Sequence, residues 1–142
     1  MSNSYHALVP GHIFMGSASD MQQAVDTEGI SVVVDLRAES TGCAAKGSVK
    51  WIKVPLGDNS PSAEVDLFDQ AIDEVIAAYK DGKKVAFHCG MGRGRTGTVA
   101  AGVLLRLGLS PNLAQAEEDA KAIRPEISIQ PVQHKALEAI FG

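Results

Sequence analysis

The sequence has few cysteines and no surplus of positive charge, and each absence excludes a broad class of proteins. Cys43 and Cys89 are the two thiols, which is too few for the disulfide scaffold of a small secreted protein. The net charge is −4 and the pI is near 5.5. This charge argues against a nucleic-acid-binding domain, which is usually basic, although it leaves a local basic pocket possible.

Long apolar segments are also missing. No apolar run approaches the roughly 18 residues of a membrane-spanning helix. The first 14 residues contain neither the basic nor the apolar region of a secretory signal peptide. We therefore expect a cytoplasmic protein, in a compartment that keeps thiols reduced, with no membrane span.

The sequence does contain short apolar runs that alternate with amphipathic segments. Its 142 residues, 45% of them hydrophobic, suffice for a single domain over residues 1–142 with a core of its own. No internal repeat or low-complexity segment is present. Extended segments are predicted at residues 13–15, 31–36, 51–54 and 84–88. The second and fourth are continuous apolar runs, which are typical of strands buried on both faces of a parallel sheet.

Helices are predicted over residues 19–28, 63–80, 96–107, 110–124 and 131–141. The second has one apolar stripe, with Ser60 and Pro61 at its entry. The third is apolar on most sides and is expected to be buried, and residues 39–48 are expected to form a loop. The alternation predicts an α/β fold with a central, mostly parallel sheet of four to five strands flanked by helices.

The strongest chemical signal is VAFHCGMGRGRTGTVAA, residues 85–101, where a predicted strand meets the buried helix. Residues 92–97 match the glycine pattern of a dinucleotide-binding turn, with Glu117 lying 20 residues further on. However, a second helix follows where that fold needs a strand. A P-loop is excluded because the lysine of its motif is missing. The remaining feature is a thiol, Cys89, separated by five residues from Arg95.

These residues describe an anion cradle with a nucleophile at its base. Glycines allow successive backbone N–H groups to turn inward, and the N-terminus of the following helix directs its free N–H groups to the same point. Arg95 adds a planar donor suited to two phosphate oxygens. The same field favours the thiolate of Cys89, Thr96 is expected to donate a hydrogen bond to the sulfur, and His88 is expected to orient the loop. A structural cysteine beside an ordinary loop would explain fewer of these residues.

HCGMGRGRTG, residues 88–97, resembles the signature of the cysteine-dependent protein tyrosine phosphatases, and specifically of their small dual-specificity branch. The flanking segments IFMGS at 13–17 and GISVVVDLR at 29–37 are similar to the family's opening strands. RPEISIQPVQ at 124–133 is similar to the segment before its last helix. The resemblance covers roughly residues 13–140, with the phosphatase loop between a central strand and a buried helix.

The resemblance implies a role for each residue of the signature. Cys89 would attack phosphorus to form a phosphocysteine, Arg95 would stabilise the transition state, and Thr96 would assist the departure of the sulfur. No metal or other cofactor is implied. The backbone groups that would bind the phosphoryl oxygens belong to Gly90, Met91, Gly92, Arg93, Gly94 and Arg95.

The family also uses an aspartate about thirty residues before the cysteine to protonate the leaving oxygen. Asp58 lies 31 residues before Cys89, in a loop flanked by Gly57 and Asn59, and is the candidate for this general acid. The alternative for Asp58 is a plain turn residue. The competing carboxylates lie in the predicted helix 63–80 and are expected to be solvated charges or, at its first turn, a partner of the helix dipole: Glu64, Asp66 and Asp69.

Three further features stay open. Many relatives position the attacking water with a glutamine, and Gln130 and Gln133 are both available for this role; the alternative for each is an exposed amide at the start of the last helix. Asp35 and Arg37 end a buried strand at the carboxyl edge of the sheet, where a structural ion pair is favoured over a role at the rim of the site. Cys43 could trap the catalytic thiol as a disulfide under oxidation, but an unreactive loop cysteine is expected.

The expected substrate is a phosphorylated protein, with phosphotyrosine first and phosphoserine or phosphothreonine also admitted. The chain is too short for the loops that build a deep phosphotyrosine slot. Arg93 matches a basic position of relatives that act on inositol lipids, so a phosphoinositide or another small phosphate ester is the alternative. A non-catalytic phosphate-binding module and a sulfur- or arsenic-handling cysteine enzyme complete the alternatives. The oligomeric state is not indicated by the sequence.

Overall fold

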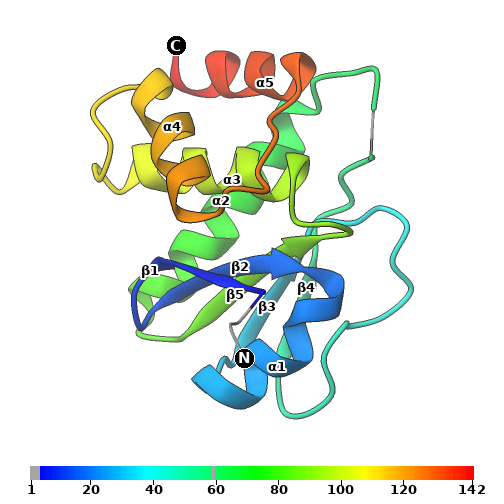
Figure 1. Cartoon of the computed structure of the whole chain (residues 1–142). Helices are drawn as coiled ribbons and strands as arrows, with labels where there is room; N and C mark the ends of the chain where they lie inside the picture. The colour runs from blue at the N-terminus through cyan, green and yellow to red at the C-terminus, as the bar shows by residue number, and fades with distance from the viewer. Residues whose placement is uncertain (1–3, 59) are drawn as a thin grey trace.

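The computed structural model describes residues 4–58 and 60–142, and its framework is a five-stranded sheet (Figure 1). The strand order is β1-β2-β5-β3-β4, with β1 antiparallel to β2 and the other neighbours parallel. The predicted α/β class and mostly parallel sheet are confirmed, and β5 lies in the middle. The strands are β1 His6–Val9, β2 Ile13–Ser17, β3 Val32–Asp35, β4 Lys50–Lys53 and β5 Val85–Cys89.

The sequence prediction missed β1. Its four residues contain a single fully buried side chain, Leu8, so no continuous apolar run marks it as a strand. It pairs with β2 through a hairpin in which Gly11 adopts a φ of +79° and the His12 N–H donates to Val9 O at 3.0 Å. The other four strands begin and end within two residues of their predicted bounds.

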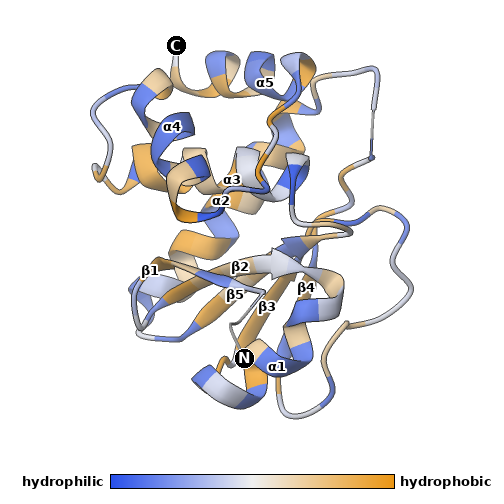
Figure 2. Ribbon diagram, viewed as in Figure 1, coloured by the Kyte–Doolittle hydropathy of each residue, from blue (hydrophilic) through white to orange (hydrophobic). Residues whose placement is uncertain are grey.

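Helices cover both faces of the sheet (Figure 1). One face carries α1, and the other carries α2, α3, α4 and α5. Successive side chains of a strand alternate between the two cores, so Val33 of β3 packs on the α1 side while Val32 and Val34 pack on the other. Figure 2 shows the apolar colour along the strands and on the helix sides that face them. The helices are α1 Met21–Glu28, α2 Val65–Lys80, α3 Gly94–Arg106, α4 Leu113–Ile123 and α5 Pro131–Phe141, with a short 3-10 turn at Ala18–Asp20.

Several helices begin at other residues than the sequence indicated. α2 begins at Val65, so Pro61 precedes the helix instead of opening it, and Glu64 is its N-cap with a φ of +50° rather than a first-turn residue. α3 begins at Gly94, two residues earlier than predicted, and its expected burial is confirmed over residues 95–104. α4 begins three residues later than predicted, after Asn112, whose side chain caps it. Within the two described ranges, no helix is both long and apolar enough to cross a membrane.

Candidate active site

The loop that follows β5 is held at the carboxyl edge of the sheet, where ligand sites of parallel sheets lie. β5 ends at Cys89 and α3 begins at Gly94, so four residues connect the central strand to the helix N-terminus. The Gly90 carbonyl accepts a hydrogen bond from the Ala18 N–H at 3.1 Å, which ties the loop to the segment after β2. We call residues 89–95 the signature loop.

Gly92 is the position at which this loop requires glycine. Its φ is +72°, and a Cβ built there would lie 2.8 Å from the backbone carbonyl carbon and oxygen of Gly16. An L-residue would be strained in that conformation and would also collide with β2. The backbone of the loop at position 92 therefore lies so close to β2 that no residue with a side chain would fit there.

The sulfur of Cys89 is buried beneath the loop, and the residue is only 3% exposed. The Thr96 hydroxyl donates to Sγ at 3.1 Å. The N-terminus of α3, with its free N–H groups and positive dipole end, follows directly on the loop. The structure thus brings together the thiol, the hydroxyl and the helix end that the sequence indicated.

Arg95 is also buried, at 3% exposed, and its guanidinium is held by two backbone carbonyls and a carboxylate. Nη1 donates to Leu56 O at 2.9 Å and to Leu36 O at 3.4 Å. The Glu39 carboxylate accepts from Nη1 at 2.9 Å and from Nη2 at 3.0 Å. Burial disfavours the charged form, but the bonds to Glu39 and the Coulomb interaction with Cys89 outweigh it, and the pKa of Arg95 is raised.

These contacts leave one edge of the guanidinium unused. No residue within 4–58 or 60–142 accepts a hydrogen bond from Arg95 Nε, and Nη2 has a second N–H beyond the one that Glu39 accepts. Nε–H and this Nη2–H point in parallel from the same edge. Such an edge matches two oxygens of a phosphoryl group.

Glu39 is a site residue that the sequence prediction placed in an ordinary loop. Its side chain is 53% exposed, and the hydrogen bonds from Arg95 lower its pKa. The available signal was a carboxylate four residues after the end of β3, at the carboxyl edge of the sheet. That signal was weak, because the partner lies 56 residues away in the sequence.

A hollow of about 330 Å³ opens above the sulfur. Its lining includes the signature loop apart from Gly92, together with Glu39 and with Asp58, which lies exposed in the loop after β4. The other carboxylates considered lie elsewhere: Glu64 accepts from the Gly57 N–H at 3.1 Å, and Asp69 pairs with Arg106 at 2.7 Å. Asp58 therefore shares the hollow with the thiol, whereas its neighbour Asn59 lies outside the described residues.

Comparison with known proteins agrees with this geometry. Residues 13–138 match the family described as dual specificity phosphatase, catalytic domain. The chain belongs to the dual-specificity phosphatases. The family resemblance drawn from the signature is thereby confirmed, and the chain is a cysteine-based phosphatase.

Solved structures of phosphatases share the fold. A mouse putative dual specificity phosphatase complexed with zinc tungstate is 21% identical, with a TM-score of 0.83, over 98% of this chain and 87% of that one. Human DUSP28 is 23% identical, with a TM-score of 0.82, over 98% and 93%. PTPMT1 in complex with PI(5)P is 19% identical, with a TM-score of 0.78, over 96% and 93%. A search of curated proteins found no match.

The two glutamines of the phosphatase both line the hollow. Gln133 is 7% exposed, and its Oε1 accepts from the Gln130 N–H at 2.9 Å. Its amide also lies against Gly94, because a Cβ there would be 2.9 Å from Gln133 Nε2. Gln130 is exposed at the mouth. Both therefore remain candidates for positioning water.

His88 is fully buried and does not contact the sulfur through a hydrogen bond. Its Nδ1 lies 3.0 Å from Cys89 O; because a carbonyl only accepts, Nδ1 carries the proton. Burial lowers the pKa of His88, which favours the neutral ring. Nε2 has no hydrogen-bond partner in the described residues and lies 3.9 Å from Asp35 Oδ1. These contacts suit an orienting role for His88.

Asp35 and Arg37 form the ion pair that the sequence favoured. Arg37 Nε and Nη2 donate to the two carboxylate oxygens at 2.9 and 3.0 Å, and Trp51 Nε1 adds a bond at 3.0 Å. Burial alone would raise the pKa of Asp35, but the hydrogen bonds from Arg37 and Trp51 and the neighbouring positive charge together outweigh it, and the pKa is lowered. Neither residue lines the hollow.

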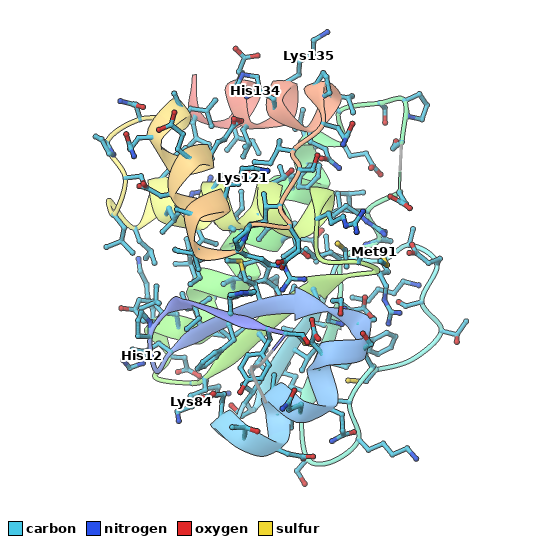
Figure 3. The ribbon with its side chains drawn as sticks, viewed as in Figure 1. His12, Lys84, Met91, Lys121, His134 and Lys135 are labelled. Carbon is cyan, nitrogen blue, oxygen red and sulfur yellow. The ribbon has the colours of Figure 1, made fainter. Side chains whose placement is uncertain are left out.

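The remaining predicted residues lie at the mouth or away from it. Met91 is 65% exposed, and Figure 3 places it at the opposite end of the sheet from His12 and Lys84. Arg93 is exposed beside it. Cys43 packs against the core on the α1 side, whereas Cys89 belongs to the core on the other side. No cluster of three or more potential metal ligands occurs in the described part of the chain.

Proposed function

We propose that this phosphatase hydrolyses phosphomonoesters of proteins, phosphotyrosine foremost and phosphoserine or phosphothreonine as well. The observation that carries the proposal is the pair of unused donors on Arg95 above a buried thiol. Two parallel N–H groups and the loop backbone offer a phosphoryl group several donors, and the sulfur lies at the base of the same hollow. Such preorganised donors stabilise the charge of a phosphoryl-transfer transition state.

The first chemical step transfers the phosphoryl group to sulfur. Cys89 Sγ attacks phosphorus, the P–O ester bond breaks, and its electron pair stays on the leaving oxygen. Asp58 gives its proton to that oxygen, so an alcohol or phenol departs. Arg95 and the loop N–H groups hold the other three oxygens throughout.

The second step releases phosphate. A water attacks phosphorus, the S–P bond breaks, and the sulfur leaves as a thiolate that accepts a hydrogen bond from Thr96. The Asp58 carboxylate takes the proton of the water and returns to its starting form. Gln130 or Gln133 would orient that water from the wall of the hollow.

The charges at the mouth support a protein rather than a polyphosphorylated lipid. Glu39 and Asp58 place two carboxylates beside the hollow, and Arg93 is the exposed cation among its lining residues. A headgroup with several phosphates would face both carboxylates. Met91 offers an exposed apolar side chain on which the ring of a phosphotyrosine can pack.

A phosphoinositide is the second candidate, and Arg93 is the observation that favours it. The solved structure of PTPMT1 in complex with PI(5)P has the same fold. The decisive assay compares kcat/KM for phosphotyrosine, phosphoserine and phosphothreonine peptides with that for vesicles containing PI(5)P. Faster hydrolysis of the lipid would refute the protein assignment.

The catalytic proposal is tested with Cys89→Ser. This variant should lose turnover of p-nitrophenyl phosphate and retain binding of tungstate, because the cradle remains intact without its nucleophile. Turnover at the wild-type rate would remove Cys89 from the mechanism. A wild-type protein that binds tungstate but never turns over, in the presence of reductant, would identify a binding module.

A further inference from the structure

Arg124 follows α4 and is buried behind the signature loop, on the side away from the sulfur. The residue is 3% exposed. Its Nε donates to Gly92 O at 2.8 Å, and its Nη2 donates to Met91 O at 3.3 Å. Arg124 does not line the hollow above Cys89 but a second hollow, which shares the loop as a common wall. The guanidinium therefore contacts the loop from the outside.

The two carbonyls belong to consecutive peptide units of the loop. In a trans peptide the N–H points opposite to the C=O. When Arg124 holds the carbonyls of Met91 and Gly92 outward, the N–H groups of Gly92 and Arg93 are directed the other way. A cation on a carbonyl also polarises its peptide unit, which makes the N–H a stronger donor.

The buried charge is surrounded by further partners that hold it in place. Nη1 donates to Ser4 O and lies 3.1 Å from His6 Nδ1. Two carboxylates lie nearby, Glu126 at 3.4 Å and Asp20 at 3.9 Å. These hydrogen bonds and ion pairs together fix the position of the Arg124 side chain. A buried charge is costly unless it is compensated in this way.

We propose that Arg124 is a positioning residue of this phosphatase, which orients and polarises the loop peptides that bind the phosphoryl oxygens. The inference rests on the proposed function, because it assigns to Arg124 the arrangement of the donors that this function uses. It predicts that Arg124 supports anion binding without touching the anion.

Arg124→Met, Arg124→Lys and a matched control, Arg106→Met, test this role. Arg106 also makes two ion pairs, with Asp69 and Asp73, but lies at the far end of α3 from the loop. Tungstate affinity measured by calorimetry should fall about 10- to 100-fold in Arg124→Met, the range expected for lost hydrogen bonds to a charged group. It should fall less in Arg124→Lys, which keeps the charge, and stay at the wild-type value in Arg106→Met.

A second readout separates positioning from simple loss of stability. Cys89 is alkylated with iodoacetate, which is an anion, and separately with iodoacetamide, which is neutral. The ratio of the two rates measures how strongly the signature loop attracts an anion to the sulfur. The ratio should drop in Arg124→Met and stay unchanged in Arg106→Met, with melting temperatures measured in parallel. If Arg124→Met does not fold, Arg124→Lys and Arg124→Gln carry the same measurements.

Unchanged tungstate affinity and an unchanged alkylation ratio in folded Arg124 variants would overturn the inference. Equal losses in the Arg124 and Arg106 variants would overturn it too, because they would reflect net charge alone. Tungstate binding needs no turnover, so failure of the inference is distinguished from failure of the proposed function.

Discussion

Replacing Thr96 with valine removes the hydroxyl that lies 3.1 Å from Cys89 Sγ and keeps the shape of the side chain. Thr96 is fully buried, so water cannot replace the lost donor. A hydrogen bond to a charged group contributes about 1.5–3 kcal/mol. A step in which the sulfur leaves as a thiolate should therefore slow by about 10- to 150-fold.

The assay is rapid-mixing kinetics with p-nitrophenyl phosphate. Because release of the nitrophenol precedes hydrolysis of the phosphocysteine, Thr96→Val should give a burst of product followed by slow turnover. Thr98→Val is the matched control: the Thr98 hydroxyl is buried in the same helix but donates to Gly94 O at 2.7 Å, not to the sulfur. Equal kcat in the two variants, without a burst in Thr96→Val, would refute the role given to this hydroxyl.

Three further predictions concern the general acid, an ion pair between α4 and α5, and the packing of the core. Asp58→Ala should slow hydrolysis of phenyl phosphate by about 100-fold or more and that of p-nitrophenyl phosphate far less; equal effects on both esters would place the acid elsewhere. The hydrogen bond that His134 Nδ1 donates to the Glu117 carboxylate raises the pKa of His134 above 6.5, so the pair stabilises the fold fully below that pH and loses its effect as the pH rises. The melting-temperature difference between wild type and His134→Ala should accordingly shrink from pH 6 to pH 9, and a constant difference would contradict it. Gly102→Ala places a Cβ 2.2 Å from Ile72 Cδ1 and should cost about 1–3 kcal/mol of stability in denaturant titrations, whereas an unchanged midpoint would show that the core can shift.

The signature loop could be predicted from the sequence because its chemistry is local. The thiol, the guanidinium and the hydroxyl lie within eight residues, between a strand and a helix that each have a clear apolar pattern. The spacing alone therefore brings Cys89 and Thr96 into contact. Asp58 needed the family resemblance, since a turn aspartate has no pattern of its own.

Residues that reach the loop from distant segments could not be predicted in this way. Glu39 contacts Arg95 across 56 residues, and Arg124 contacts Gly92 across 32. Glu39 lies after β3 and Arg124 lies after α4, outside the apolar patterns of these elements, so no sequence pattern distinguishes them. The sequence prediction missed β1 for a related reason. A four-residue edge strand with one buried side chain has too short an apolar pattern to be recognised in the sequence.

The placement of the two cysteines has a consequence for recovery from oxidation. Cys43 and Cys89 pack in cores on opposite faces of the sheet, so a sulfenic acid formed at Cys89 has no resolving thiol at hand within its own core. Peroxide should therefore drive the enzyme toward mixed disulfides with small thiols such as glutathione, or onward to the irreversible sulfinic acid. Regaining activity then depends on reductants supplied by the surroundings rather than on the chain itself.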